Sequence, residues 1–128
     1  MGDSITQFWA DDPFLKGSKV LVGRGIAGQT ASQMLLRFRG DVIDLRPAVV
    51  HIMAGTNDVA QNNGPETPEE IEGYIVSMVE LAQANNIKVV LASIPPARDF
   101  AWHKGLEPAP KIAAINQWLK GYAARMKL

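Results

Sequence analysis

The sequence predicts an α/β fold in which a parallel sheet is covered by helices on both faces. From Lys19 onward, short runs rich in β-branched residues alternate with longer helical patterns, which is the order that builds such a sheet. The second of these runs is apolar on both sides, as a buried parallel strand is. The chain has 128 residues, of which 47% are apolar and 20% charged, so it suits one soluble globular domain, residues 1–128.

The predicted elements follow one another with short connections. Ser4 to Trp9 is typical of a helix start with Ser4 as the N-cap, and only Met1 precedes Gly2, where a strand would be expected. Strands are predicted at residues 20–22, 48–53 and 87–92, and further helices at residues 29–38, 67–82 and 109–126. The helix that ends at Phe38 is expected to stop at Gly40. One strand before Ser4 and one after Leu128 would make the alternation regular, so the first and last strands are expected to be missing.

The third predicted helix has the clearest start signal. Thr67 can cap it, Pro68 suits its first turn, and Glu70 can complete a capping box.

Composition excludes several classes of function. Thirteen basic residues balance thirteen acidic ones, so charge gives no reason to expect nucleic acid or an anionic membrane as a partner. The chain has no cysteine, which rules out disulfides, thiolate metal sites and cysteine nucleophiles. No apolar stretch is long enough to span a bilayer. A soluble protein is expected, and the compartment stays open between the cytoplasm and export.

A glycine-rich stretch, Gly23 to Gly28, matches the dinucleotide-binding pattern GxGxxG between a predicted strand and a predicted helix. That function also needs an acidic residue at the tip of the next strand, and this strand ends at Ala54 and Gly55 instead. We therefore expect the glycines to ease a tight turn, with nucleotide binding as the less favoured alternative.

A polar loop follows the predicted strand 48–53, at the carboxyl end where open α/β sheets place their sites. Asn57 offers a side-chain N–H to a developing negative charge, and Gly55 allows a ligand to approach closely. An Asx turn without a catalytic role remains an equal alternative for this segment taken alone.

Three blocks of sequence carry a family resemblance: residues 2–6 (GDSIT), 25–30 (GIAGQT) and 55–58 (GTND). In that order they resemble the SGNH hydrolases, also called the GDSL esterase/lipase family, and residues 99–108 look like a clade of small bacterial members. The resemblance implies a flavodoxin-like three-layer α/β/α sandwich whose first strand is central in the sheet. It also implies hydrolysis of small acyl, acetyl-type carboxylic esters through an acyl-enzyme, with no metal or organic cofactor and a small-molecule ester as the partner.

The resemblance assigns roles to three residues. Ser4 maps to the nucleophile, and the Ser4 backbone N–H, Gly28 and Asn57 map to the oxyanion hole. These parts suit ester cleavage, which needs a hydroxyl nucleophile and donors aimed at the tetrahedral oxyanion. The Gly-x-Ser-x-Gly elbow of the α/β-hydrolases is absent from the sequence.

The general base of the family is missing. It comes from an Asp-x-x-His motif, and no such motif occurs in these residues. His51 lies within a predicted strand and is expected to be structural. His103 lies four residues after Asp99 and is expected to be a loop residue, with a substitute general base as the less favoured alternative. A non-catalytic fragment or pseudoenzyme that keeps the pocket is therefore the alternative function. The oligomeric state stays open, with a domain-swapped dimer among the alternatives.

Overall fold

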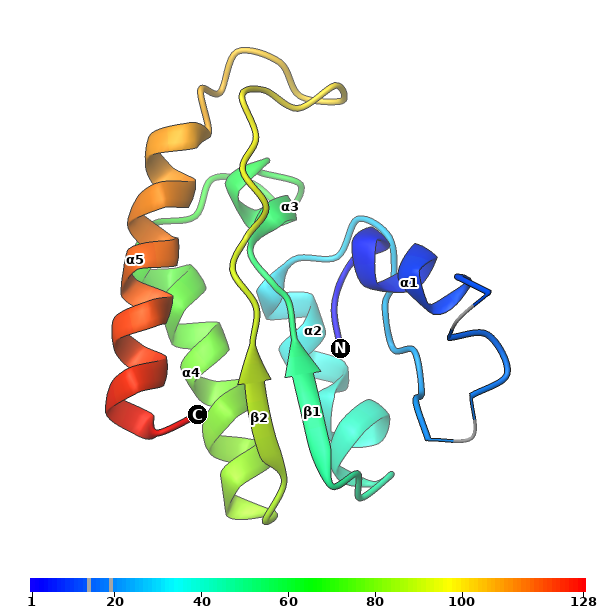
Figure 1. Ribbon diagram of the computed structural model, residues 1–128. Helices are drawn as coiled ribbons and strands as arrows, with labels where there is room; N and C mark the ends of the chain where they lie inside the picture. Colours follow the sequence, from blue (N-terminus) through cyan, green and yellow to red (C-terminus); the bar gives the residue numbers. More distant parts are fainter. Residues whose placement is uncertain (14, 19) are drawn as a thin grey trace.

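The computed structural model describes residues 1–13, 15–18 and 20–128, and its described residues form a small parallel sheet with helices packed beside it (Figure 1). β1 (Val49–Ile52) and β2 (Lys88–Leu91) pair in parallel, with Val50 opposite Val89. The helices are α1 (Ser4–Ala10), α2 (Ala31–Phe38), α3 (Thr56–Val59), α4 (Pro68–Ala84) and α5 (Ala109–Met126). The predicted α/β class with a parallel sheet is confirmed. Lys19, where the predicted alternation starts, lies outside the described residues.

The first two residues extend this sheet beside β1. The Met1 amino group donates to the carbonyl of His51 at 2.8 Å, and the Met53 N–H donates to the Met1 carbonyl at 3.1 Å. On their other side, the Gly2 N–H donates to the Arg24 carbonyl and the Ile26 N–H donates to the Gly2 carbonyl. The order across the sheet is therefore residues 24–26, residues 1–2, β1 and β2, with residues 1–2 in the inner position expected for the first strand.

Residues 20–22 do not form the predicted strand. Val20 is 89% exposed, and Leu21 and Val22 are exposed as well. Between this segment and Val49 to His51 lies a groove of about 470 Å³ instead of a neighbouring strand. A strand is stable only when its backbone groups have partners. Residues 20–22 therefore have no regular secondary structure, and pairing begins further along the chain, at the bridge between Gly25 and Gly2.

β1 was predicted to be buried on both faces, and this is wrong in the described residues. Val50 and Ile52 are buried, whereas Val49 on the opposite face is 48% exposed, and Val90, the partner of His51 on β2, is 49% exposed. α2 and α4 pack against each other behind the strands in Figure 1 and cover the buried face. The centre of the core combines side chains from these helices, α5 and the sheet, among them Met34, Phe38, Ile52, Ile75, Met78, Val89 and Ile115.

The helix ends show which local signals hold. α4 begins as predicted, because Thr67 Oγ1 accepts from the Glu70 N–H and the Glu70 carboxylate accepts from the Thr67 N–H. α2 ends at Phe38, but Gly40 does not stop the helical path. A π-helical turn, Arg39–Ile43, continues it and buries Val42.

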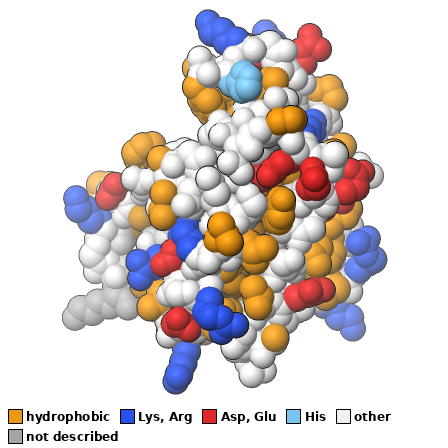
Figure 2. Space-filling view, turned by 180° about the vertical axis from the view of Figure 1, so that it is seen from behind, with side chains coloured by type: hydrophobic (Ala, Val, Ile, Leu, Met, Phe, Trp, Pro, Cys, Tyr) orange, Lys and Arg blue, Asp and Glu red, His pale blue; other side chains and the backbone are white. Residues whose placement is uncertain are grey.

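The surface carries charges of both signs. Figure 2 shows the side opposite to that in Figure 1, where acidic and basic side chains both occur among apolar ones. None of the described helices has the length and apolar character needed to cross a bilayer.

Candidate active site

Ser4 opens α1, directly after the short segment that pairs with β1. The sequence predicted Ser4 as the N-cap of this helix, but the cap is Asp3. The Ile5 N–H donates to Asp3 Oδ1 at 2.9 Å. Asp3 is only 1% exposed, and this burial raises the pKa of its carboxyl while the hydrogen bond from Ile5 opposes the rise. Ser4 is thus the first helical residue, and it is half-buried.

The Gly25 to Gln29 loop lies against the start of α1. Gly25 forms a parallel bridge with Gly2, and a Cβ on Gly25 would lie 2.1 Å from the backbone nitrogen of Gln7. The Gln7 side chain accepts from the Ala27 N–H at 2.7 Å. Gly28 has a φ of +78°, which favours glycine. These contacts place Gly28 near the same helix that Ser4 begins.

The close packing of this glycine-rich segment against α1 also tests the nucleotide-binding alternative for the GxGxxG pattern. A Cβ on Gly23 would lie 2.4 Å from the Cβ of Ala10, so Gly23, like Gly25, permits close packing against α1. The expected strand before the pattern is also not formed. Both observations favour the structural role of these glycines over nucleotide binding.

Asn57 lies in α3, directly beyond the carboxyl end of β1, and is 4% exposed. Its Nδ2 donates to the carbonyl of Gln29 at 2.9 Å and lies 3.5 Å from Asp3 Oδ2. The Asn57 amide therefore touches the residue before Ser4 and the residue after Gly28. The structure brings the surroundings of all three predicted site residues together at one edge of the sheet, where α1 and α3 begin (Figure 1).

Two residues that the sequence analysis did not single out belong to this network. Asn62 Nδ2 donates to Asn57 Oδ1 at 2.9 Å and to the Gly28 carbonyl at 3.2 Å. Trp102 Nε1 in turn donates to Asn62 Oδ1 at 2.9 Å. The only sequence signal for them was weak: Asn62 is one of two adjacent asparagines in a polar loop, and Trp102 lies in a second loop.

Asp58 is the most perturbed acid of the site region. It is 1% exposed, and its Oδ1 accepts from the Ala31 N–H at 2.8 Å, which ties α3 to the start of α2. Burial raises the pKa of Asp58 to about 7, the Ala31 hydrogen bond opposes this rise, and the negative charge of Glu66 adds to it. Asp58 therefore holds its proton over much of the acidic pH range.

Neither histidine bonds to Ser4 in the part of the chain that the structure describes. The His51 ring is half-buried and makes an edge-on contact with Trp9, at 6.0 Å between ring centroids. Its pKa is lowered by burial and then by the nearby amino terminus. The Nδ1 of His103 lies 2.7 Å from the Ala60 carbonyl, and Asp99 accepts from the Phe100 and Gly105 N–H groups instead of from His103.

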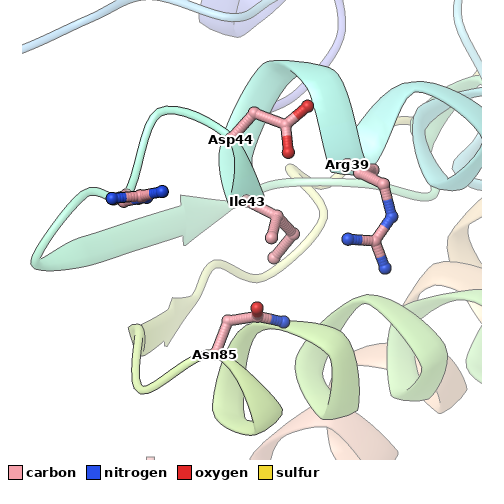
Figure 3. Close-up of a pocket in the computed structure, with 5 residues that line it drawn as sticks. Arg39, Ile43, Asp44 and Asn85 are labelled. Atoms are coloured by element: carbon pink, nitrogen blue, oxygen red, sulfur yellow. The ribbon is translucent and has the colours of Figure 1, made fainter.

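A cavity of about 520 Å³, shown in Figure 3, is lined by none of the residues of this network. It is lined by Arg39, Ile43, Asp44, Arg46 and Asn85. These residues precede β1 and β2 in the chain, so they lie at the amino ends of the strands, whereas α/β sheets bind ligands at the carboxyl ends. No group of three or more metal-binding side chains occurs among the residues described.

Solved structures and a curated protein sequence are similar to this chain. A protein described as an acylhydrolase of Bacteroides fragilis NCTC 9343 is 48% identical with a TM-score of 0.97, and a GDSL-like lipase of Bacteroides thetaiotaomicron VPI-5482 is 46% identical with a TM-score of 0.96. Each covers 100% of this chain, which spans 62% and 63% of their respective lengths. The uncharacterized lipoprotein YqeF of Bacillus subtilis (strain 168) is 31% identical over 63% of this chain and 35% of its own length.

The sequence profile of one family matches the whole chain, residues 1–128. That profile describes GDSL-like lipases and acylhydrolases, in agreement with the three sequence blocks and with the parallel α/β architecture. The chain belongs to the GDSL-like lipase/acylhydrolase family.

Proposed function

We propose that these residues carry the nucleophile and the oxyanion hole of a serine ester hydrolase that cleaves small acyl, acetyl-type esters. Family membership supports ester hydrolysis in general terms. The observation that carries the finer proposal is the Asn57 amide, which contacts Asp3 beside Ser4 and Gln29 beside Gly28. A lone Asx turn would give no reason for these contacts with two distant segments.

In the proposed reaction, Ser4 Oγ attacks the ester carbonyl and loses its proton to a general base. The Ser4 N–H, the Gly28 N–H and Asn57 Nδ2 donate to the oxyanion, which such donors can stabilise by about 3 to 4 kcal/mol each. The C–O bond to the alcohol then breaks, the base returns the proton to the leaving alcohol, and water hydrolyses the acyl-enzyme.

The base is the part that these residues do not supply, since they contain no Asp-x-x-His. The second candidate is a non-catalytic module that keeps the pocket. An exported location is a further proposal, motivated by the similarity to a lipoprotein.

The test uses a lengthened chain, in which the flanking regions of the B. thetaiotaomicron relative are added before Met1 and after Leu128. We expect it to hydrolyse p-nitrophenyl acetate faster than the octanoate ester. Ser4→Ala should remove nearly all activity, and Asn57→Ala should lower kcat by about 100-fold or more. Activity that survives Ser4→Ala would overturn the proposal, and a folded but inactive lengthened chain would favour the non-catalytic module.

A further inference from the structure

We propose that Asn62 is a positioning residue for the oxyanion hole and that Trp102 holds Asn62 in place. The inference rests on the proposed function, because Gly28 and Asn57 matter to catalysis only if they bind an oxyanion. It adds two residues that act through others and do not touch the substrate themselves.

The hydrogen-bond network has a fixed direction. The indole of Trp102 can only donate, so the Asn62 atom that faces it must be the carbonyl oxygen. Asn62 Nδ2 then faces Asn57, whose own oxygen must accept. The Asn57 Nδ2 consequently points to the Gln29 carbonyl and toward Asp3, on the side of Ser4.

This direction matters because a side-chain amide can rotate by 180° and present oxygen where nitrogen is needed. An oxygen of Asn57 turned toward the oxyanion would repel it. Without Asn62, only the hydrogen bond to the Gln29 carbonyl and the long 3.5 Å contact with Asp3 Oδ2 would oppose the flip. Asn62 adds a second bond that a flipped Asn57 would also lose.

Asn62 also fixes the second donor. Its Nδ2 donates to the Gly28 carbonyl, while the N–H of Ala27, the residue before Gly28, is bound by Gln7. The Gly28 N–H therefore lies between two anchored peptide groups. A glycine at a φ of +78° would otherwise be free to reorient.

The anchor of Asn62 comes from a distant loop. Trp102 is 60% exposed, yet its only polar atom is bound to Asn62, and its ring lies 5.1 Å from that of the buried Phe100. Asn62 itself is exposed. An exposed side chain with three hydrogen bonds is expected to affect orientation more than stability.

The kinetic test compares Asn62→Ala, Asn62→Asp and Trp102→Phe in the lengthened chain described above. Asn62→Asp keeps the acceptor for Trp102 but loses both donated bonds, so it should lower kcat at least as much as Asn62→Ala. We expect a loss of about 10- to 100-fold in kcat with KM changed less than about twofold, and a few-fold loss for Trp102→Phe. The matched control is Asn63→Ala, which removes the neighbouring exposed amide.

A second measurement does not depend on activity. In the 128-residue chain, the side-chain amide resonances of Asn57 in a ¹⁵N NMR spectrum should shift on Asn62→Ala and stay in place on Asn63→Ala. Unchanged Asn57 resonances would overturn the positioning role whether or not the chain hydrolyses esters. Turnover lost in Ser4→Ala but kept in Asn62→Ala would overturn this inference alone, and turnover kept in both Ser4→Ala and Asn57→Ala would overturn the proposed function with it.

Discussion

At the scale of single residues, the buried carboxyl of Asp58 makes the stability of the folded chain depend on pH. Its folded-state pKa of about 7 lies above the ordinary value of 3.8, chiefly because of burial. The folded chain therefore holds a proton that the unfolded chain releases between these two values. The contribution of Asp58 to stability is fully present below about pH 3.8 and is lost as the pH rises through about 7.

We predict that Asp58→Asn flattens the pH dependence of stability, because asparagine keeps an acceptor for the Ala31 N–H but does not ionise. The free energy of unfolding in urea, measured at pH 4.5 and pH 7, should fall less with pH in the variant than in the parent. Asp44→Asn, at an exposed position, is the control and should leave the slope unchanged. Equal slopes in parent and Asp58→Asn would contradict the prediction.

Gly25 gives a second test at this scale. A Cβ there would lie 2.1 Å from the Gln7 nitrogen and 2.6 Å from the Thr6 carbonyl carbon, both backbone atoms that cannot move aside. Gly25→Ala should therefore destabilise the chain by about 1 to 3 kcal/mol or more. Gly40→Ala is the control, because a Cβ there meets nothing within 4 Å, and it should be neutral or slightly stabilising. Thermal unfolding of the parent and both variants measures the difference.

At the scale of elements, helices were more predictable than strands. The 109–126 helix has the predicted bounds, and the Thr67 capping box forms as expected, because a helix satisfies its backbone locally. Residues 20–22 have the composition of a strand, but a strand needs a neighbour, and composition does not say whether that neighbour is present. The π-helical turn through Gly40 had no sequence signal that we recognised.

The α4 capping box leads to a prediction about helix stability. Thr67→Ala removes the acceptor of the Glu70 N–H and should lower the free energy of unfolding by about 1 kcal/mol. Thr67→Ser keeps a hydroxyl and should restore most of the loss. Chemical unfolding followed by circular dichroism measures both variants, and a Thr67→Ala variant as stable as the parent would show that the cap contributes nothing.

At the scale of the whole molecule, sequence predicted the family and three candidate site residues whose surroundings meet at one edge of the sheet, and their catalytic roles stay predictions. Asn62 and Trp102 were not predicted, because the positioning roles proposed for them depend on side-chain contacts between loops 40 residues apart in the chain. A pattern within one segment carries no information about such a contact. The exposed Val49 and Val90 were missed for a related reason, since burial depends on what covers a face.

The 128 residues alone should hydrolyse p-nitrophenyl acetate feebly or not at all. A serine hydroxyl is a weak nucleophile without a base, and the two histidines are engaged elsewhere, His51 against Trp9 and His103 at the Ala60 carbonyl. The lengthened chain serves as the active comparison. Robust turnover by the short chain that disappears on His103→Ala would show that the loop histidine acts as the base.

The pairing of Met1 and Gly2 with both neighbouring segments has a kinetic consequence. Four hydrogen bonds hold these residues, and in the 128-residue chain they lie at an end, where local opening is more frequent than in the middle of a sheet. The amide protons of Ile26 and Met53, which bond to this end, should therefore exchange with deuterium sooner than the amides shared by β1 and β2. Ser4 follows these residues directly, so in the 128-residue chain the paired fraction sets an upper limit on the fraction of molecules in which Ser4 is held beside the sheet.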